Sequence, residues 1–469
     1  MRQKNRRTTV SGTLFTGGAV VTMDPRTGDL ERGDVLVRAD RIVAVGADLT
    51  THPDAVGATV VDTAGRVVAP GFVDTHRHAW QAQMRRSIPD VSDLGAYVAS
   101  TLGEVAPRYT PHDMYVGTRL AALTALDAGI TTMLDFSHNS RTAAHSDAAI
   151  RALADTGIRG VHASMGPHFG DWDRQWPGDL ERLCADHQGA GEGLVTIRLA
   201  ALATDEIAGP SLAYGKELAA VARVLGLGVS VDAVFGAPSS EAILSWADTD
   251  LLGPGLCLIH ATGLSPDAWR AMGETGTTVS LAPSSDAQIG LESAVPAVDE
   301  ALAVGIRPGL SIDVEVALSS DMFTQMRTLL AIQRMRAVRG VYGSGEPVPD
   351  RITTRDVLDF ATRQGARTVG LGESTGMLSP GRQADLIVVD AGDVNTMPLN
   401  DPVGTLVLGA DARNIETVMV AGRIRKAHGR LVGVDLDDLR EEVTASRDRI
   451  VASLGQRSSR ARERSRTDH

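Results

Sequence analysis

Two histidines stand two residues apart at the end of an apolar run, in the segment Pro70-Gly71-Phe72-Val73-Asp74-Thr75-His76-Arg77-His78. On a β-strand, residues i and i+2 point to the same face, so His76 and His78 can each offer a ring nitrogen to one metal ion while Arg77 faces away. Zinc binds imidazole nitrogen at about 2.0–2.1 Å. Short histidine pairs also occur on solvated strands. The Pro-Gly break before this run and the polar, aromatic continuation after it favour a strand that opens into a functional loop.

Two further side chains close apolar runs in the same way. Asp313 ends the run 309–313, where a carboxylate is costly to bury unless it is paired or binds a metal ion. A metal-binding role is therefore favoured over a helix cap or a salt bridge. His260 follows four apolar residues, 256–259. An isolated histidine in such a place is more often a satisfied core residue, but its position at a strand end favours a role in the same site.

The middle of the chain, residues 69–377, alternates strand-like apolar runs with helical patterns, which is typical of βα units and a parallel sheet. The eight runs are residues 71–74, 131–135, 160–163, 195–199, 228–232, 257–260, 278–281 and 309–313. Eight runs predict an α/β fold with a closed (β/α)8 TIM-like barrel. Catalytic groups of such barrels gather at the C-terminal ends of the strands. The polar side chains at those ends are His76, His78, Asp135, His138, Asp232, His260 and Asp313.

The two ends of the chain have a different pattern. Residues 10–68 and 378–435 contain short alternating runs broken by Gly, Asp and Pro, as half-buried antiparallel strands do. They predict one small β-sandwich domain built from both chain ends. Residues 436–454 are expected to form a C-terminal helix on the outside of the barrel. The Ser- and Arg-rich residues 455–469 have little to bury and are expected to be a disordered tail.

Composition narrows the class of protein. The 469 residues are 43% hydrophobic and 22% charged, which is ordinary for a globular enzyme, and the net charge of −12 disfavours nucleic acid as a partner. No apolar stretch approaches the ~20 residues of a membrane span, and no secretory signal is evident. Two cysteines are too few for a disulfide framework, so we expect a cytoplasmic protein. A homodimer acting on a small-molecule substrate is the base-rate expectation.

Residues 70–81 resemble the metal-binding strand of the amidohydrolase superfamily, in the branch that contains cytosine deaminase-like and chlorohydrolase-like enzymes. Further motifs of this family follow in the same order at residues 128–135, 258–261, 311–313, 365–367, 370–372 and 377–388. The resemblance extends over nearly all of residues 10–435. It implies the (β/α)8 barrel and the small domain built from both ends.

The resemblance also implies a set of site residues. The family has two histidines on strand one, histidines on strands five and six, and an aspartate on strand eight. His76, His78, His260 and Asp313 match, but Asp232 stands in place of the strand-five histidine. Many deaminases have a proton-shuttling glutamate three residues later, where this chain has Phe235.

Asp232 can still act as a ligand, because carboxylate oxygen binds zinc, iron or manganese at about 2.0–2.2 Å. No lysine ends the fourth run, so a carbamylated-lysine two-metal centre is not expected. We therefore expect one divalent metal ion, zinc before iron or manganese. The expected ligands are His76, His78, Asp232 and Asp313. If the shorter side chain of Asp232 does not reach the metal, His260 takes the vacant place or a water bridges the gap. The other alternative is that the strand-five change weakens or abolishes metal binding.

In the implied mechanism Asp313 accepts a proton from the attacking water, and His260 polarises the substrate or stabilises developing negative charge. The proton donor to the leaving group is either Asp313 acting in both directions or Glu315, two residues further on. Substrate contacts are expected from loops after the strands. The candidates are Trp80, Gln81, His138 and His168, of which the two histidines fit loop or capping roles equally well.

The expected reaction is hydrolysis of a C–N bond, with deamination of an amino-substituted nitrogen heterocycle as the leading case. The same site could hydrolyse a cyclic amide, an amidine or a ring halide. The alternative from another class is a metal-poor homologue that binds a small molecule or performs non-hydrolytic chemistry, because Asp232 replaces a ligand histidine. An interaction module that uses the basic tail is supported by composition alone.

Overall fold

Eight parallel strands form the central sheet of the computed structural model, which describes residues 12–291, 293, 295–343 and 348–467. The strands are β6 (Phe72–Arg77), β7 (Ile130–Ser137), β8 (Arg159–Ser164), β9 (Val195–Leu202), β10 (Val229–Ala233), β11 (Leu256–His260), β12 (Thr278–Leu281) and β13 (Gly309–Leu310). Their order in the sheet is their order in the chain, and each pairs in parallel with the next. The predicted (β/α)8 TIM-like barrel is confirmed.

The barrel closes between β13 and β6 through the segment that carries Asp313. The backbone N–H of Asp313 donates to the carbonyl of His76 at 2.9 Å, and the N–H of His78 donates to the carbonyl of Asp313 at 3.2 Å. Below them, the Thr75 hydroxyl donates to the carbonyl of Leu310 at 2.9 Å. The last strand is thus short, and the bonds that complete the barrel run through the proposed metal ligands.

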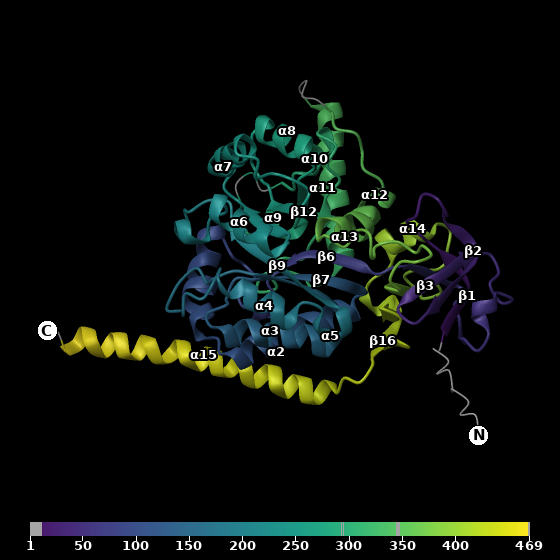
Figure 1. Cartoon of the computed structure of the whole chain (residues 1–469), viewed down its shortest axis with the longest axis horizontal. Coiled ribbons are helices and arrows are strands. Elements are labelled where there is room, and N and C mark those ends of the chain that lie inside the picture. The colour runs from purple at the N-terminus through teal and green to yellow at the C-terminus, as the bar shows by residue number, and fades with distance from the viewer. Residues whose placement is uncertain (1–11, 292, 294, 344–347, 468–469) are drawn as a thin grey trace.

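Helices cover the outside of the barrel (Figure 1). The main ones are α2 (Pro111–Asp127), α3 (Ala143–Thr156), α4 (Asp179–His187), α6 (Lys216–Leu225), α7 (Gly236–Asp248), α8 (Pro266–Thr275) and α11 (Met322–Tyr342). Shorter ones are α1 (Leu94–Tyr97), α5 (Ala190–Gly193), α9 (Pro283–Gln288), α10 (Val298–Ala303), α12 (Thr354–Asp359), α13 (Gly365–Thr368) and α14 (Pro402–Gly404). Local sequence sets the ends of α2: Pro111 occupies its first turn, and Thr110 and Asp113 form a capping box before it. The buried faces of these helices and the strands form one continuous aliphatic core.

The small domain is built from both chain ends, as predicted. Its strands are β1 (Gly12–Val20), β2 (Leu30–Arg38), β3 (Arg41–Gly46), β4 (Thr59–Asp62), β5 (Arg66–Pro70), β14 (Leu386–Asp390), β15 (Ile415–Val420), β16 (Arg423–Ala427) and β17 (Arg430–Leu431). They hydrogen-bond into one nine-stranded sheet, in which antiparallel pairing of β5 with β14 joins the two ends. Figure 1 shows the purple and yellow-green strands side by side. Along β14, Ile387 and Val389 join the barrel core, whereas Leu386 and Val388 join the core of the small domain.

The last helix, α15 (Leu436–Thr467), is longer than the range 436–454 expected from the sequence. It packs along α2, where the Ser446 hydroxyl donates to Asp113 at 2.7 Å and Arg449 forms an ion pair with the same carboxylate. Its final turns extend beyond the barrel (Figure 1). Among the described residues, no helix combines the length and the apolar character that crossing a membrane requires.

Candidate metal and active site

The histidine pair lies at the C-terminal end of β6, as the sequence indicated. His76 is fully buried and His78 is 4% exposed. Their Nε2 atoms lie 3.1 and 3.2 Å from the same oxygen, Oδ1 of Asp313. Nδ1 of His78 lies 3.1 Å from the carbonyl of Phe136 and donates to it, because a carbonyl can only accept. This bond fixes the tautomer of His78 and leaves Nε2 free to bind a cation.

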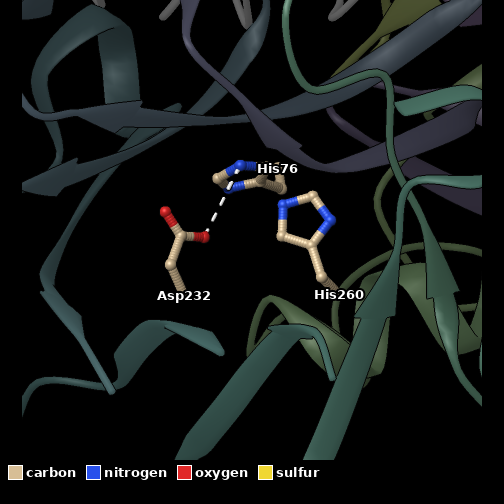
Figure 2. Close-up of side chains that lie close together, drawn as sticks. All are labelled: His76, Asp232 and His260. Carbon is tan, nitrogen blue, oxygen red and sulfur yellow. Dashed lines mark ion pairs between the residues drawn. The ribbon is translucent and has the colours of Figure 1, made fainter. Parts of the chain in front are cut away.

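Asp232, at the end of β10, approaches the pair from the opposite wall of the barrel. Its Oδ1 lies 3.8 Å from Nε2 of His76, and this buried oxygen has no hydrogen-bond partner among the described residues. Figure 2 shows Asp232, His76 and His260 converging on one space. A buried carboxylate oxygen without a hydrogen-bond partner is costly, so its position beside two imidazoles suits a cation ligand.

Donor spacing supports the same conclusion. Four donors placed tetrahedrally at about 2.0–2.1 Å from zinc would be roughly 3.3–3.4 Å apart. Among the expected ligands, Nε2 of His76 and of His78 lie 3.1 and 3.2 Å from Asp313, and Nε2 of His76 lies 3.8 Å from Asp232. Two overlapping groups that share His76 could hold the ion: one adds Asp232 and His260, the other His78 and Asp313. In each group the ligand atoms lie within 4.8 Å of one another. The residues expected to bind the metal are therefore brought together and fit a divalent cation.

His260 is held in place by Asp286. The sequence shows no sign of this contact beyond the position of Asp286 after the seventh strand. Nδ1 of His260 lies 2.7 Å from Oδ1 of Asp286, and Nε2 lies 3.8 Å from Oδ2 of Asp313. Burial alone would lower the pKa of His260, but the hydrogen bond and charge of Asp286, together with Asp313 and Asp232, raise it to about 9. The bond to Asp286 turns Nε2 of the ring toward the site.

Asp313 is the centre of the polar cluster. Nε2 of both β6 histidines contacts it, and the Ser285 hydroxyl donates to its Oδ2. Burial opposes its ionisation, but its contacts with His76 and His78 and the charge of His260 hold its pKa well below the usual value. Its backbone φ is +69°, and that of His260 is +64°. Left-handed backbone at non-glycine residues costs on the order of 1–3 kcal/mol each and is concentrated at functional sites.

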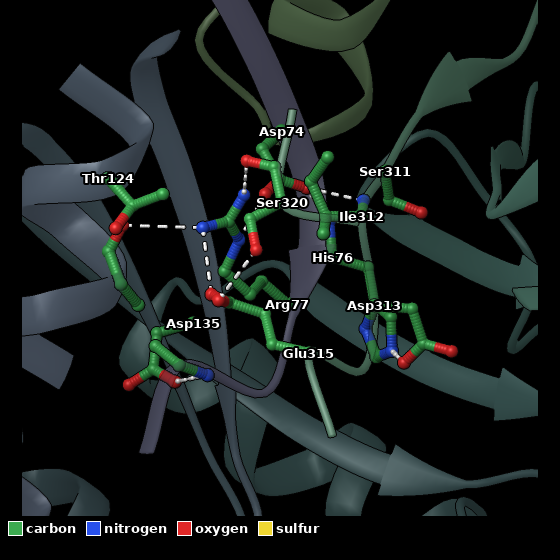
Figure 3. Close-up of polar contacts among 12 residues, drawn as sticks. Asp74, His76, Arg77, Thr124, Asp135, Ser311, Ile312, Asp313, Glu315 and Ser320 are labelled. Carbon is green, nitrogen blue, oxygen red and sulfur yellow. Dashed lines mark hydrogen bonds and ion pairs between the residues drawn. The ribbon is translucent and has the colours of Figure 1, made fainter. Parts of the chain in front are cut away.

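Glu315 is not the proton donor that the sequence suggested. It was expected to share a face with Asp313, but the left-handed turn at Asp313 redirects the chain. Glu315 is buried, lies 3.1 Å from Nη1 of Arg77, and pairs with Arg85 and the Ser320 hydroxyl (Figure 3). Burial would raise its pKa, but Arg85 and Arg77 lower it. Glu315 therefore serves as the counter-ion of two arginines behind β6.

The same network ties β6 to the segment that carries Asp313. Nε of Arg77 donates to Oδ2 of Asp74 at 2.7 Å, and the backbone N–H of Ile312 donates to Oδ1 of Asp74 at 3.0 Å (Figure 3). Asp135, at the end of the second strand, accepts from the N–H of Ala79 at 3.3 Å. These contacts position the ligand-bearing segments and place Asp135 in a supporting role.

Of the four expected substrate contacts, two line the active-site cavity and two do not. His138 and His168 line a cavity of about 50 Å³ above the metal ligands, together with His78, His260 and Asp313. Trp80 and Gln81 are fully buried behind that wall and are not among its lining residues. Trp80 donates its Nε1–H to Nδ1 of His138 at 3.1 Å, and Gln81 donates to the Tyr97 hydroxyl at 2.8 Å.

Phe235 stands where many deaminases have a glutamate, and this limits which carboxylates can relay a proton. Phe235 does not line the cavity, and its neighbour Val234 does. Among the described lining residues, Asp232 and Asp313 are the only carboxylates. Any proton relay through a carboxylate must therefore use one of these two groups.

Comparisons with known proteins agree with the fold. The sequence profile described as "Amidohydrolase family" matches residues 67–425. A 5'-deoxyadenosine deaminase of Methanosarcina mazei is 27% identical over 94% of this chain and 99% of its own length. A 5-methylthioadenosine/S-adenosylhomocysteine deaminase of Symbiobacterium thermophilum is 30% identical over 88% of this chain and 92% of its own length. Among solved structures, an adenosine deaminase from Xanthomonas campestris with bound zinc superposes with a TM-score of 0.78 at 20% identity, covering 94% of this chain and 99% of that one.

Proposed function

The chain belongs to the amidohydrolase family, and from this premise we propose that it is a metal-dependent hydrolase that deaminates an amino-substituted nitrogen heterocycle. One observation carries the proposal: the donors of His76, His78 and Asp313 lie within 4.8 Å of one another, and Asp232 presents a buried oxygen without a hydrogen-bond partner 3.8 Å from Nε2 of His76. The deaminase names of the relatives support the choice of a C–N bond. Hydrolysis of a cyclic amide, an amidine or a ring halide would use the same groups.

We propose that these four residues hold one divalent ion, with zinc as the first candidate, since imidazole and carboxylate together suit it. When bound, such an ion lowers the pKa of a coordinated water from 15.7 toward about 7 and so supplies hydroxide at neutral pH. The zinc in the adenosine deaminase structure supports this choice of metal. Iron or manganese remains the alternative, because two carboxylates make a harder donor set than three histidines and one aspartate.

The residues of the chain would divide the proton transfers between them. Asp313 accepts a proton from the attacking water, and the Nε2–H of His260 donates a hydrogen bond to the substrate atom that gains negative charge. Because Glu315 is engaged by Arg77 and Arg85, Asp313 also returns the proton to the leaving amine. Asp286 keeps His260 oriented during both steps through its bond to Nδ1.

Metal content per chain is the first test, measured by elemental analysis of protein purified without chelator or affinity metal. About one zinc, iron or manganese per chain, with ammonia released from a panel of amino-heterocycles, supports the proposal. A metal-free protein that gains no activity when these ions are added contradicts it. In that case the replacement at Asp232 has disabled the site, and the ligand-binding alternative leads.

We also propose that the enzyme works in the cytoplasm as a homodimer. The two described cysteines, Cys184 and Cys257, are both free thiols, which fits a reducing compartment. Light scattering of the purified protein tests the dimer, and fractionation of the producing cell tests the compartment.

A further inference from the structure

The wall of the active-site cavity is mainly aliphatic. Leu94, Val98 and Leu102 cover it from α1 and the π-helical turn Val98–Val105, and Leu202, Ile207 and Leu291 add further apolar surface. Apolar side chains stabilise a ligand through the area that they remove from water, about 25 cal/mol per Å². Such a wall favours alkyl substituents on the bound molecule.

The charged groups of the described lining all belong to the metal site. Asp232 and Asp313 face the ion, and His260 is paired with Asp286. No lysine or arginine is among the described lining residues, so the one cationic side chain that a carboxylate or phosphate on the ligand would meet there is His260, whose charge is already balanced by Asp286. No carboxylate is left to accept from the vicinal hydroxyls of a ribose, which is a common way of recognising that sugar.

Besides the Tyr97 hydroxyl, which accepts from Gln81, two imidazoles of the described lining remain for hydrogen bonds to the substrate. Nδ1 of His138 accepts from Trp80, so its hydrogen is on Nε2 and can be donated. The ring stacks on His78 with centroids 3.9 Å apart and 14° between planes, and the ring of His168 stands edge-on to it at 5.0 Å. Nδ1 of His168 is buried without a hydrogen-bond partner in the described structure. One donor and one unpaired ring nitrogen match the ring nitrogen and amino group of a flat heterocycle.

We propose that the substrate is an uncharged aromatic nitrogen heterocycle that carries alkyl or alkylamino groups, read by His138 and His168, and that ribosylated or anionic analogues are disfavoured. This inference rests on the proposed function and differs from the nucleosides named for the relatives. It follows from the neutral, aliphatic lining and from the two unengaged imidazole nitrogens.

The size of the cavity adds a condition. Its volume of about 50 Å³ is well below the roughly 300–1,000 Å³ of typical ligand pockets, so substrate entry must displace part of the wall. Leu94 and Leu291, which both line the cavity, lie in segments that meet where Gly290, at φ +70°, packs against the backbone of Ser92 and Asp93. Both side chains are aliphatic, so this part of the wall is apolar.

A matched pair of probes tests the inference: 9-propyladenine and 5'-deoxyadenosine share the heterocycle and the leaving amine and differ in the alkyl or deoxyribosyl substituent. An amino-bis(isopropylamino)-triazine serves as a third, ribose-free probe. Thermal shift and ammonia release are measured on the metal-loaded protein. We expect both apolar probes to raise Tm and at least one to be deaminated with a kcat/KM at least tenfold above that of 5'-deoxyadenosine.

The outcomes separate the two proposals. Preference for 5'-deoxyadenosine overturns the substrate inference and leaves the hydrolase assignment intact. A thermal shift with the apolar probes but no ammonia from any compound supports the pocket inference and contradicts deamination. Absence of any shift and of any turnover with the apolar probes overturns the substrate inference as well.

Variants of the two cavity histidines test whether they recognise the substrate. His138→Phe and His168→Phe keep ring shape and remove the hydrogen-bonding nitrogens, so each should raise KM for the apolar probe about three- to tenfold, with metal content unchanged. His187→Gln, at a partly exposed histidine that ends α4 and pairs with Asp147 of α3, is the matched control and should leave KM unchanged. Wild-type KM in both phenylalanine variants would exclude these imidazoles from substrate recognition.

Discussion

Nδ1 of His260 and Oδ1 of Asp286 lie 2.7 Å apart in a buried ion pair that joins the end of β11 to the helix after β12. The bond turns Nε2 of His260 toward Asp313, so the orientation of this ring is set before any substrate arrives. A residue outside the histidine motifs therefore determines how the sixth strand takes part in the chemistry.

The pair predicts a pH dependence of stability in metal-free protein. The pKa of His260 is raised to about 9 in the folded state, above the ~6.5 of an unfolded chain. Its stabilising contribution is complete below about pH 6.5 and is lost as pH rises through 9. We expect Tm to fall between pH 7 and 10, and to fall less in Asp286→Asn. Asp147→Asn, which removes the partner of a partly exposed histidine, serves as control. Equal slopes in wild type and Asp286→Asn would show that the pair does not titrate in this range.

Asp232 should control metal affinity and metal preference. Asp232→Asn removes the anionic ligand, and we expect zinc affinity to fall at least about tenfold. Asp232→His supplies an imidazole, which favours zinc over manganese more than a carboxylate does. Competition with a coloured chelator measures both affinities. If zinc and manganese affinities are unchanged in both variants, Asp232 does not bind the ion.

Asp313→Asn should remove turnover while the fold is kept. The amide cannot accept the proton of the attacking water, and loss of general-base catalysis typically costs roughly 10²–10⁴-fold in rate. Circular dichroism confirms the fold, and kcat with saturating amino-heterocycle and added metal gives the effect. A kcat within threefold of wild type would remove Asp313 from its assigned role.

The Glu315 network should matter for stability more than an exposed ion pair does. Glu315→Gln leaves Arg77, which is fully buried, without one of its two carboxylates, and breaking a buried pair of this kind costs about 3–5 kcal/mol. Glu442→Gln breaks the partly exposed pair with Arg119 and should cost at most about 1 kcal/mol. Urea unfolding of both variants gives the comparison. Equal losses would mean that the buried network contributes no more than the surface one.

Sequence reasoning located the strand ends that carry the candidate ligands, because local pattern determines structure there. The spacing of His76 and His78 and the apolar run before Asp313 indicate strand ends directly, because strands alternate with period two. The role of Glu315 could not be predicted, since it depends on a left-handed backbone at Asp313 that no short pattern specifies. The bond from His260 to Asp286 spans 26 residues and two elements, and only the assembled barrel brings the two side chains together.

In the small domain, too, local sequence pattern predicted the strands but not how they pair. Alternating apolar residues indicated strands at both chain ends, but their union in one nine-stranded sheet depends on the pairing of β5 with β14, more than 300 residues apart in sequence. The helix α15 continues past residue 454, where the loss of apolar residues led us to expect its end. The pattern of apolar residues therefore predicted where helices and strands occur, but not where they end.

Closure of the barrel through Asp313 has a consequence for how the protein is made. Asp313 follows His76 by 237 residues, so a growing chain carries the histidine pair long before it can complete the ring. We expect nascent fragments that end before residue 313 to have little affinity for the ion, and metal capture to coincide with the last step of assembly. A bound ion would then link the first barrel strand to the segment that completes the ring, and hydrogen exchange along β6 should report whether that link is in place.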